Sequence, residues 1–375
     1  MVTFFCIVYF LTIILYFFKQ FKMSIKDRKL LLIIWGILLF IVVVFRPIEI
    51  ADTANYKEIF EKIDIDRNYL RFSSDGILRK EPTTAVEYGF VVLTQLIKRY
   101  ITNNFRVYFG IICLLEFLFF MRYMRIICEK DYKKIGDCLY YLLPYFGFMY
   151  LLVVIRGGLA YAIAFNAYAL TKEWNEVDKS KPMFFRVIIA ALLYFVAFSI
   201  HRLVFLFLVV EAIYFLVPVF NKKIYKIIWI IAFALEFFNL LAAKTIFRDL
   251  MVRLSGSITF LGTYGRQLSS EVAEQGFSVR RLFFLLIGIL VLTFFDTLDD
   301  RNKKFFGIYI FGLIILPFFS YIPGFSRITD LMISYIVMGL TTVHSTLYSS
   351  KKKSVIFAFD ILYMIAGISI ITRLQ

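Results

Sequence analysis

The chain has 375 residues, of which 61% are apolar and 19% aromatic, and its mean hydropathy is +0.78. This apolar content is well above the roughly 45–50% of an ordinary soluble domain, so the composition argues against a water-soluble globular protein. The formal net charge of +16 comes from Lys and Arg residues dealt out between apolar segments. Because they form no single basic stripe with interleaved aromatics, nucleic acid is not an expected partner.

Apolar segments of about 15–22 residues recur along the chain, close to the roughly 20 residues that cross a bilayer as a helix. They predict an all-α polytopic membrane protein with about 12 transmembrane helices and two longer outer-face loops. The predicted spans are Val2–Phe18, Leu30–Phe45, Val107–Tyr123, Gly136–Ile155, Gly157–Leu170, Met183–Ile200, Leu203–Val219, Ile227–Ala242, Leu282–Phe295, Phe305–Tyr321, Leu331–Leu347 and Val355–Ile371.

Basic residues cluster in short loops between these segments, and the positive-inside rule places such loops in the cytoplasm. The predicted cytoplasmic loops are Lys19–Lys29, Arg122–Lys134, Lys172–Arg186, Lys222–Lys226, Arg301–Lys304 and Lys351–Lys353. Both termini, the hairpin tips at Arg156 and His201, and the longer loops 46–106 and 243–281 are then expected on the outer face. We expect one membrane domain over residues 1–375.

Inside the first long loop, the segment 87–96 is apolar but too short to span, so it is predicted as an interfacial or re-entrant helix. An amphipathic piece lies around Tyr56–Ile65. The first span lacks a basic leader and a cleavage site, which favours a retained helix over a signal peptide. None of the four cysteines is placed for an external disulfide, and their thiols are interpreted as buried apolar groups: Cys6, Cys113, Cys128 and Cys138.

Polar residues gather on the predicted outer face. They are Arg46, Asp52, Glu87, Arg156, His201, Arg202, Tyr264, Arg266, Arg280, Arg281, Arg327 and Asp330. One histidine, several arginines and carboxylates at one depth can supply a general base and an anion clamp, which predicts a phosphate-bearing substrate. Arginine forks bind phosphate bidentately and stay charged near apolar surroundings, so they suit a pyrophosphate without requiring a metal ion.

Each of these residues also has a purely structural interpretation. Arg156 could be a snorkelling anchor beside a tight turn, and His201 could be a satisfied interfacial histidine. Arg327 could face lipid head groups. Asp52 and Glu87 could be helix N-caps or dipole partners.

Other acidic residues carry weaker signals. The segment Asp64-Ile65-Asp66 matches the Asp-x-Asp pattern of divalent-ion sites, but so short a match arises easily by chance. Four acids inside predicted helices have no motif and are interpreted as packing or helix–helix hydrogen bonds: Glu116, Glu211, Glu236 and Asp360. His344, near the inner end of a helix, is interpreted as structural.

Five short segments in order resemble the Wzy/EpsG-type family of O-antigen and exopolysaccharide polymerases over nearly the whole chain. They are Arg46 with Asp52-Thr53-Ala54-Asn55-Tyr56, Glu87-Tyr88-Gly89-Phe90-Val91-Val92-Leu93, Ile155-Arg156-Gly157-Gly158-Leu159-Ala160, Ser199-Ile200-His201 and Arg327-Ile328-Thr329-Asp330. The chain departs from the family pattern at Ala51, where a glycine is expected, and at Gly157, where a glutamine is common.

The resemblance implies a metal-independent membrane glycosyltransferase without a cofactor. Its substrates would be oligosaccharide repeat units on undecaprenyl pyrophosphate, joined into O-antigen or capsule/exopolysaccharide at the outer face of the bacterial inner (cytoplasmic) membrane. Candidate partners are these lipid-linked glycans, the lipid bilayer and a chain-length regulator. The alternatives are a flippase or other transporter of the lipid-linked unit, which would spread charges through both halves of the membrane, and an O-antigen ligase.

Within that mechanism the resemblance assigns a role to each candidate residue. Arg156 and Arg327 would hold the pyrophosphates, with Arg46 or Arg280 in support. His201 or Glu87 would accept the proton of the attacking hydroxyl. Asp52 would orient the sugar or the base, and Tyr264 would contact sugar.

Overall fold

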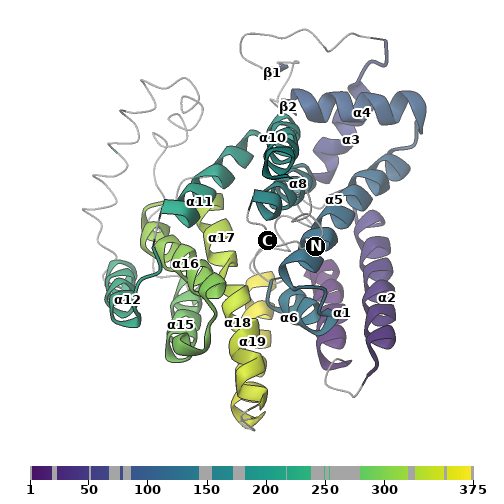
Figure 1. The fold of residues 1–375 in the computed structure, drawn as a ribbon. Coiled ribbons are helices and arrows are strands. Elements are labelled where there is room, and N and C mark those ends of the chain that lie inside the picture. The colour runs from purple at the N-terminus through teal and green to yellow at the C-terminus, as the bar shows by residue number, and fades with distance from the viewer. Residues whose placement is uncertain are drawn as a thin grey trace. The chain divides into compact units, whose positions relative to one another are not determined.

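The computed structural model describes residues 2–18, 23–49, 52–66, 77–78, 86–142, 154–171, 182–216, 218–237, 249, 253, 279–319, 326–349 and 353–372. In these ranges the chain is almost entirely helical (Figure 1). The exception is a small antiparallel pair, β1 (Ile77–Leu78) with β2 (Val86–Glu87). The chain divides into two compact units: unit 1 holds Met1–Leu208 with Ile371–Gln375, and unit 2 holds Val209–Ile370.

Unit 1 contains the predicted first long loop and the helices around it. Its elements are α1 (Val2–Phe18), α2 (Ile25–Val44), α3 (Thr53–Lys62), α4 (Tyr88–Tyr100), α5 (Phe105–Ile127), α6 (Tyr132–Leu142), α8 (Ile155–Thr171), α10 (Met183–Ile200), the 3₁₀ turn η2 (Arg202–Val204) and the start of α11 (Phe205–Leu216). Helices α1 and α10 have the predicted bounds. Helix α2 begins earlier than predicted because Ser24 and Asp27 cap it reciprocally, each accepting from the other's backbone N–H.

Helix α8 packs against α5 and α10 and is the most buried helix of unit 1. Every residue from 157 to 170 is buried, and its many glycines and alanines let the neighbouring backbones approach closely. Its partner α5 adds specific contacts: Tyr123 stacks on Phe165 with ring centroids 4.5 Å apart, and Arg122 donates to Asn166 Oδ1 at 2.6 Å. The predicted span Gly157–Leu170 is therefore an interior helix.

Helix α4 covers the predicted short helix at 87–96 and lies crosswise to α1 and α2 (Figure 1). Helix α3 covers most of the predicted amphipathic piece at Tyr56–Ile65 and packs on α4 and α5. Two side chains of α4 hold the end of α3: Lys98 Nζ donates to the carbonyls of Phe60, Glu61 and Ile63, and Gln95 Nε2 donates to those of Asp64 and Ile65. Whether α4 lies in a membrane interface stays a prediction.

Unit 2 holds the remaining predicted spans. Its elements are the rest of α11, α12 (Lys222–Phe237), α15 (Val279–Thr293), the 3₁₀ turn η4 (Phe295–Thr297), α16 (Asp300–Phe319), α17 (Ser326–Ser334), α18 (Ile336–Ser349) and α19 (Lys353–Thr372). The predicted span Leu331–Leu347 is divided at Tyr335, where backbone bonds of the i→i+3 kind link Tyr335 to Met332 and Met338 to Tyr335.

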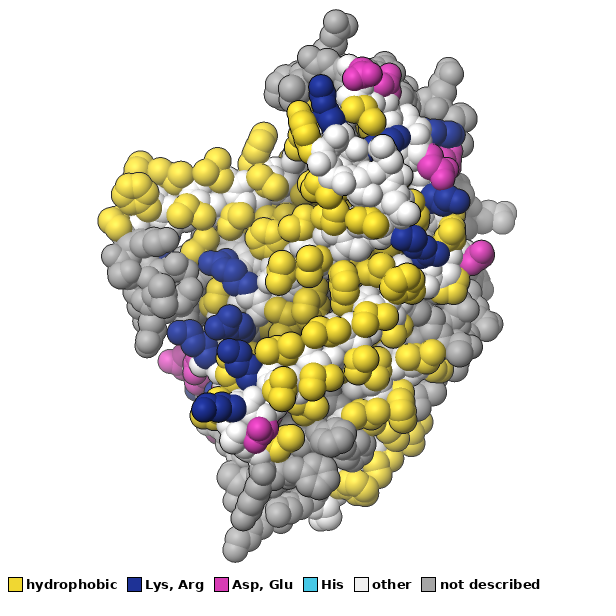
Figure 2. Space-filling view, turned by 90° about the vertical axis from the view of Figure 1, so that its right-hand side faces the viewer, with side chains coloured by type: hydrophobic (Ala, Val, Ile, Leu, Met, Phe, Trp, Pro, Cys, Tyr) yellow, Lys and Arg dark blue, Asp and Glu magenta, His cyan; other side chains and the backbone are white. Residues whose placement is uncertain are grey.

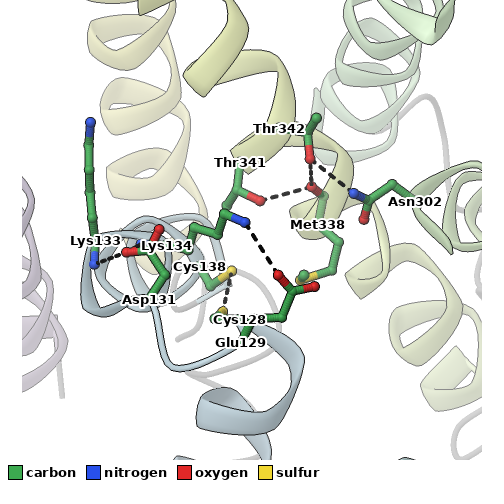
Figure 3. Close-up of polar contacts among 10 residues, drawn as sticks. All are labelled: Cys128, Glu129, Asp131, Lys133, Lys134, Cys138, Asn302, Met338, Thr341 and Thr342. Carbon is green, nitrogen blue, oxygen red and sulfur yellow. Dashed lines mark hydrogen bonds and ion pairs between the residues drawn. The ribbon is translucent and has the colours of Figure 1, made fainter. Parts of the chain in front are cut away.

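Buried polar contacts join the helices of unit 2. Arg281 of α15 forms an ion pair at 2.8 Å with Glu236 of α12. Asn302 Nδ2 of α16 donates to Thr342 Oγ1 of α18 at 3.0 Å (Figure 3). His344 Nε2 lies 3.7 Å from an Asp360 carboxylate oxygen. These contacts agree with the structural interpretation of Glu236, Asp360 and His344.

Large apolar side chains cover much of the surface. On α10, Phe184, Leu192 and Phe195 are each at least 60% exposed, and on α2 Ile37 is 54% exposed. Figure 2 shows a broad apolar area on the side of the molecule that carries α2, with charged side chains mostly outside it. Within the described ranges, two helices are long and apolar enough to cross a membrane, Phe105–Ile127 and Met183–Ile200, so the number of about 12 spans stays a prediction.

The turn between α5 and α6 lies in the predicted cytoplasmic loop Arg122–Lys134. Glu129 and Lys130 adopt φ values of 54° and 60°, a left-handed conformation that reverses the chain. The Sγ atoms of Cys128 and Cys138 lie 3.5 Å apart beside this turn (Figure 3). Three cysteines are buried as predicted, whereas Cys6 is exposed on α1, which corrects the expectation that all four are buried.

Candidate functional site

Three chain segments that are remote in sequence meet at one end of unit 1. They are the start of α4, the start of α8 and the C-terminal end of α10, and they bring Glu87, Arg156 and His201 together. The predicted topology placed the last two at hairpin tips on one face. Their convergence with Glu87 makes a compact centre, called here the Glu87 centre, of one carboxylate, one guanidinium and one imidazole.

Glu87 is the N-cap residue of α4, but its side chain forms no cap hydrogen bond. Its Oε1 lies 2.9 Å from His201 Nδ1 and accepts from the Arg202 backbone N–H at 3.3 Å. Its Oε2 lies 2.8 Å from a terminal nitrogen of Arg156. The carboxylate is only 12% exposed and bridges the arginine and the histidine, so the N-cap interpretation of Glu87 is replaced by that of a bridging anion.

The charge state of Glu87 follows from these contacts. Burial acts to raise the pKa of its carboxyl group, but the hydrogen bond with His201 and the positive charge of Arg156 outweigh burial and hold the pKa at about 2. Glu87 is therefore ionised throughout the physiological range. A permanent carboxylate on Nδ1 orients the imidazole ring and stabilises a proton that the ring takes up.

His201 is the C-cap residue of α10 and is 5% exposed. Glu87 engages Nδ1, and the ring edge that carries Nε2 lies against Gly157 of α8. A Cβ atom at Gly157 would be 3.3 Å from His201 Cδ2 and 3.6 Å from Nε2. Glycine at this position thus leaves the imidazole room beside the first turn of α8, at the same position where the sequence departs from the family pattern.

Arg156 lies in the first turn of α8 and is 20% exposed. Its guanidinium faces the Phe90 ring at 5.9 Å, and its backbone N–H donates to the Tyr56 hydroxyl at 3.3 Å. Its buried Nε has no hydrogen-bond partner among the described residues. The ion pair with Glu87 contradicts a purely lipid-facing anchor, because the side chain turns inward to the carboxylate.

Gly89 permits the approach of α4 to α10. A Cβ atom there would lie 2.7 Å from the backbone carbonyl carbon of Ser199. A side chain at this position would therefore push the first turn of α4 away from the end of α10. Since Glu87 is two residues before Gly89 and His201 two residues after Ser199, that contact sets the distance between carboxylate and imidazole.

Tyr56 of α3 contacts the Glu87 centre, because its hydroxyl accepts the backbone N–H of Arg156. Burial raises the pKa of its hydroxyl, and the Asp52 carboxylate adds to this, so the group stays protonated. The ring packs against Phe90 at 5.9 Å. From the sequence, Tyr56 was part of a motif and of the predicted amphipathic piece Tyr56–Ile65, without a role of its own at the site.

Arg46 follows α2 and is 1% exposed, the lowest exposure among the predicted cations whose side chains the structure describes. Its guanidinium lies 4.8 Å from the centroid of the Phe109 ring. Asp52 is the N-cap residue of α3 without a side-chain cap bond, so it occupies the predicted capping position but leaves its carboxylate uncommitted to that helix. Both residues lie in unit 1 with the Glu87 centre.

Several predicted site residues are not placed in this centre. Arg281 was predicted at the end of the outer loop 243–281, but it lies in the first turn of α15, which begins at Val279, and its side chain pairs with Glu236. Arg202 contributes its backbone N–H to Glu87. The side chains of Arg280, Arg327 and Asp330, and the whole of Tyr264 and Arg266, lie outside the described residues.

A metal site is not apparent in the ranges that the structure covers. No group of three or more His, Cys, Asp or Glu side chains converges among those residues. In the Asp-x-Asp segment, Asp64 Oδ1 accepts from the backbone N–H of Asp66 at 3.0 Å, which is a local turn contact.

Comparison with protein families gives one match. A profile described as the EpsG family matches residues 29–374, nearly the whole chain. No curated protein and no solved structure gives a significant match. The matched range contains every member of the Glu87 centre and all of the helices except α1 and the first turn of α2.

Proposed function

The chain belongs to the EpsG family, and from that premise we propose that it is a membrane glycosyltransferase of the polysaccharide-polymerase type. The substrates are oligosaccharide repeat units carried on undecaprenyl pyrophosphate, and the product is an O-antigen or capsule/exopolysaccharide chain. The observation that supports this proposal is the Glu87 centre, where one carboxylate bridges an arginine and a histidine. It combines a proton acceptor with a phosphate-binding cation at one end of unit 1.

The proposed reaction uses the two partners of Glu87 differently. A hydroxyl of the incoming lipid-linked unit attacks the anomeric carbon of the growing chain, forming the new glycosidic bond. His201 accepts the hydroxyl proton, and Glu87 stabilises the resulting imidazolium. The bond between the anomeric carbon and the phosphate oxygen breaks, and the lipid pyrophosphate leaves with its electron pair.

Arg156 supports the departure of that pyrophosphate. Its guanidinium is paired with Glu87, and its buried Nε has no hydrogen-bond partner among the described residues, so Nε can donate to a phosphate oxygen. A guanidinium can bind phosphate in two-pronged fashion and keep its charge near apolar side chains, so the mechanism requires no metal ion. Arg327, whose side chain lies outside the described residues, is the proposed second cation.

The test is glycan chain length in a deletion strain that carries plasmid variants. We expect Arg156→Ala and His201→Gln to yield single repeat units and no polymer while the protein stays in the membrane at normal abundance. Lys57→Ala is the matched control, because the Lys57 side chain on α3 is 41% exposed and pairs with Glu61, a neighbour on the same helix, at 3.7 Å. Polymer of normal length from both site variants at equal abundance would contradict the proposal.

The same experiment separates the runner-up functions. Loss of polymer with single-unit products retained indicates a polymerase, whereas loss of both indicates a ligase or a flippase. The location of the polar groups also favours an enzyme, because Glu87, Arg156 and His201 share one end of unit 1. A transporter would be expected to carry such groups through both halves of the membrane.

We place the protein in the bacterial cytoplasmic membrane with the Glu87 centre facing outward, on the basis of the cytoplasmic basic loops. Cysteine labelling in a cysteine-free background tests this orientation. Lys57→Cys, near the centre, should react with an impermeant maleimide in intact cells. Glu129→Cys, in the turn between α5 and α6, should react only after permeabilisation, and the reverse pattern would place the centre in the cytoplasm.

A further inference from the structure

We infer that Arg46 and Tyr56 form a deep subsite for a phosphate group, separate from the contact between Glu87 and Arg156. The ligand is a phosphate of the lipid-linked substrate, so the inference rests on the proposed function. Arg46, just after α2, would then bind phosphate, whereas proton transfer is carried out by the Glu87 centre.

The first support is the state of the Arg46 guanidinium. The side chain is 1% exposed, yet none of its three nitrogens has a hydrogen-bond partner within the described chain. A guanidinium carries five N–H donors, and burying them without acceptors is strongly unfavourable. In folded proteins buried polar groups nearly always have hydrogen-bond partners, and a bound anion is one source of the missing acceptors.

Nearby carboxylates attract Arg46 without contacting it. Glu116 of α5 and Asp52 of α3 both act on its charge, but neither forms an ion pair with it. Glu116 is itself 2% exposed, and both of its oxygens lack hydrogen-bond partners among the described residues. The protein therefore holds a buried cation and leaves its hydrogen-bonding edge uncommitted.

The surroundings of Arg46 fix it in this position. Arg106, at the start of α5, donates to the backbone carbonyls of Val44 at 3.1 Å and Arg46 at 2.8 Å, which caps the end of α2. The Phe109 ring lies 4.8 Å from the guanidinium. Pro47, the next residue, is exposed, so the backbone at Arg46 is adjacent to a residue at the protein surface.

Tyr56 connects this cation to the Glu87 centre. Its hydroxyl accepts the backbone N–H of Arg156, and the charges of Arg46 and Arg156 both act on this hydroxyl. A protonated hydroxyl near two arginines can add a donor to a site for a phosphate or pyrophosphate anion, and the guanidinium of Arg46 can bind such an anion in bidentate fashion.

The test measures binding and does not depend on polymerisation. The full-length protein, purified in a neutral detergent, is titrated with inorganic pyrophosphate while thermal unfolding is recorded. We expect wild type to be stabilised by pyrophosphate. In Arg46→Gln the apparent affinity should fall at least tenfold, and without ligand this variant should unfold at the same or a higher temperature because an unpaired buried charge is gone. Arg46→Lys should restore little of the affinity, since it keeps the charge without the fork.

A structural role for Arg46 gives the opposite result. If Arg46 serves only to balance Glu116, both Arg46→Gln and the matched control Glu116→Gln will unfold at lower temperature, and neither will change pyrophosphate affinity. If the Arg46→Gln protein does not accumulate in the membrane, that result also supports a structural role and contradicts the subsite. Arg46-dependent stabilisation by phosphatidylglycerol in mixed micelles, without stabilisation by pyrophosphate, would assign the subsite to a bilayer head group instead. The pyrophosphate titration measures binding and not polymerisation, so its outcome can be judged even if the glycan chain-length assay contradicts the proposed function.

Discussion

The Glu87 centre of unit 1 and the Glu236–Arg281 pair of unit 2 are both buried contacts between a glutamate and an arginine at 2.8 Å. In unit 2 the arginine is 7% exposed and the pair links adjacent helices α12 and α15. In unit 1 the carboxylate is shared between Arg156 and His201, and Arg156 is 20% exposed. One glutamate is committed to one cation, whereas the other divides its charge between two groups.

This difference distinguishes a glutamate that stabilises helix packing from one that is proposed to take part in catalysis. An ion pair between neighbouring helices offsets the charges that it buries, and removing one partner is strongly destabilising. A carboxylate shared with a histidine instead sets the orientation of a proton acceptor, and it leaves the arginine accessible to a second anion. Matched substitutions in the two regions should therefore fail in different ways.

The largest difference is expected from neutralising the two glutamates. Glu87→Gln should lower polymerisation by on the order of 10²–10⁴-fold, because it removes the anion that stabilises protonated His201. Glu236→Gln should lower the free energy of unfolding by about 3–5 kcal/mol, because it removes the carboxylate that compensates the buried charge of Arg281. Turnover per folded molecule and thermal unfolding, measured on the same preparations, separate the two effects. Equal loss of turnover per folded molecule in both variants would remove the distinction.

The pH dependence of stability should also distinguish the shared glutamate. The pKa of Glu87 is about 2 in the folded protein, below its ordinary value of 4.5. A lowered folded-state pKa contributes stability that is fully present above 4.5 and is lost as the pH falls toward 2. The difference corresponds to about 3 kcal/mol. Unfolding of wild type and Glu87→Gln between pH 6 and 3 should show a steeper loss in wild type, and parallel curves would contradict the low pKa.

Two glycines offer a third comparison. Gly89→Ala would bring a methyl group within 2.7 Å of the Ser199 backbone and should separate Glu87 from His201, lowering activity by roughly 10–100-fold. In Gly288→Ala of unit 2 the new Cβ would lie 2.6 Å from the buried Tyr309 hydroxyl and 3.2 Å from the Trp229 ring. It should cost about 1–3 kcal/mol of stability and leave turnover per folded molecule near wild type. Normal activity in Gly89→Ala would show that the close helix contact does not position Glu87.

Much of this arrangement follows from hydrophobicity and charge along the chain. Continuous apolar runs predicted the bounds of α1 and α10, since nothing within them interrupts a helix. The alternation of basic loops placed Arg156 and His201 at tips on one face, and the structure brings both to one end of unit 1. The sequence also nominated Glu87, because an acid opens a short apolar helix there.

Long-range contacts could not be predicted in the same way. The sequence left open which acid meets His201, because the pairing joins positions 87 and 201 through the packing of α4 on α10. Arg281 was misplaced because the start of a helix is uncertain by a few residues, and one turn decides whether a side chain is in a loop or buried. The interior position of α8 depends on its small residues, which a simple apolar count does not weigh.

The smallest effect is expected at Lys98, which touches no member of the Glu87 centre. Its Nζ donates to three carbonyls at the end of α3, at 2.9–3.1 Å. These bonds hold α3, which carries Tyr56, against α4, whose N-cap residue is Glu87. Lys98→Met keeps the length of the side chain but leaves those carbonyls without their donor. We expect a roughly 3–10-fold loss of turnover, since a small displacement of positioning groups lowers the rate without removing a reacting one.

The Lys98 effect should be specific to position and charge. Lys98→Arg should recover part of the turnover, and Lys57→Met on α3, where the side chain is 41% exposed, should retain all of it. A positioning role also predicts weaker pyrophosphate binding in Lys98→Met, because the charges of Arg46 and Arg156 both act on the Tyr56 hydroxyl. If Lys98→Met lowers only the thermal midpoint and leaves both turnover and pyrophosphate affinity unchanged, the contact between α3 and α4 stabilises the fold without positioning the site.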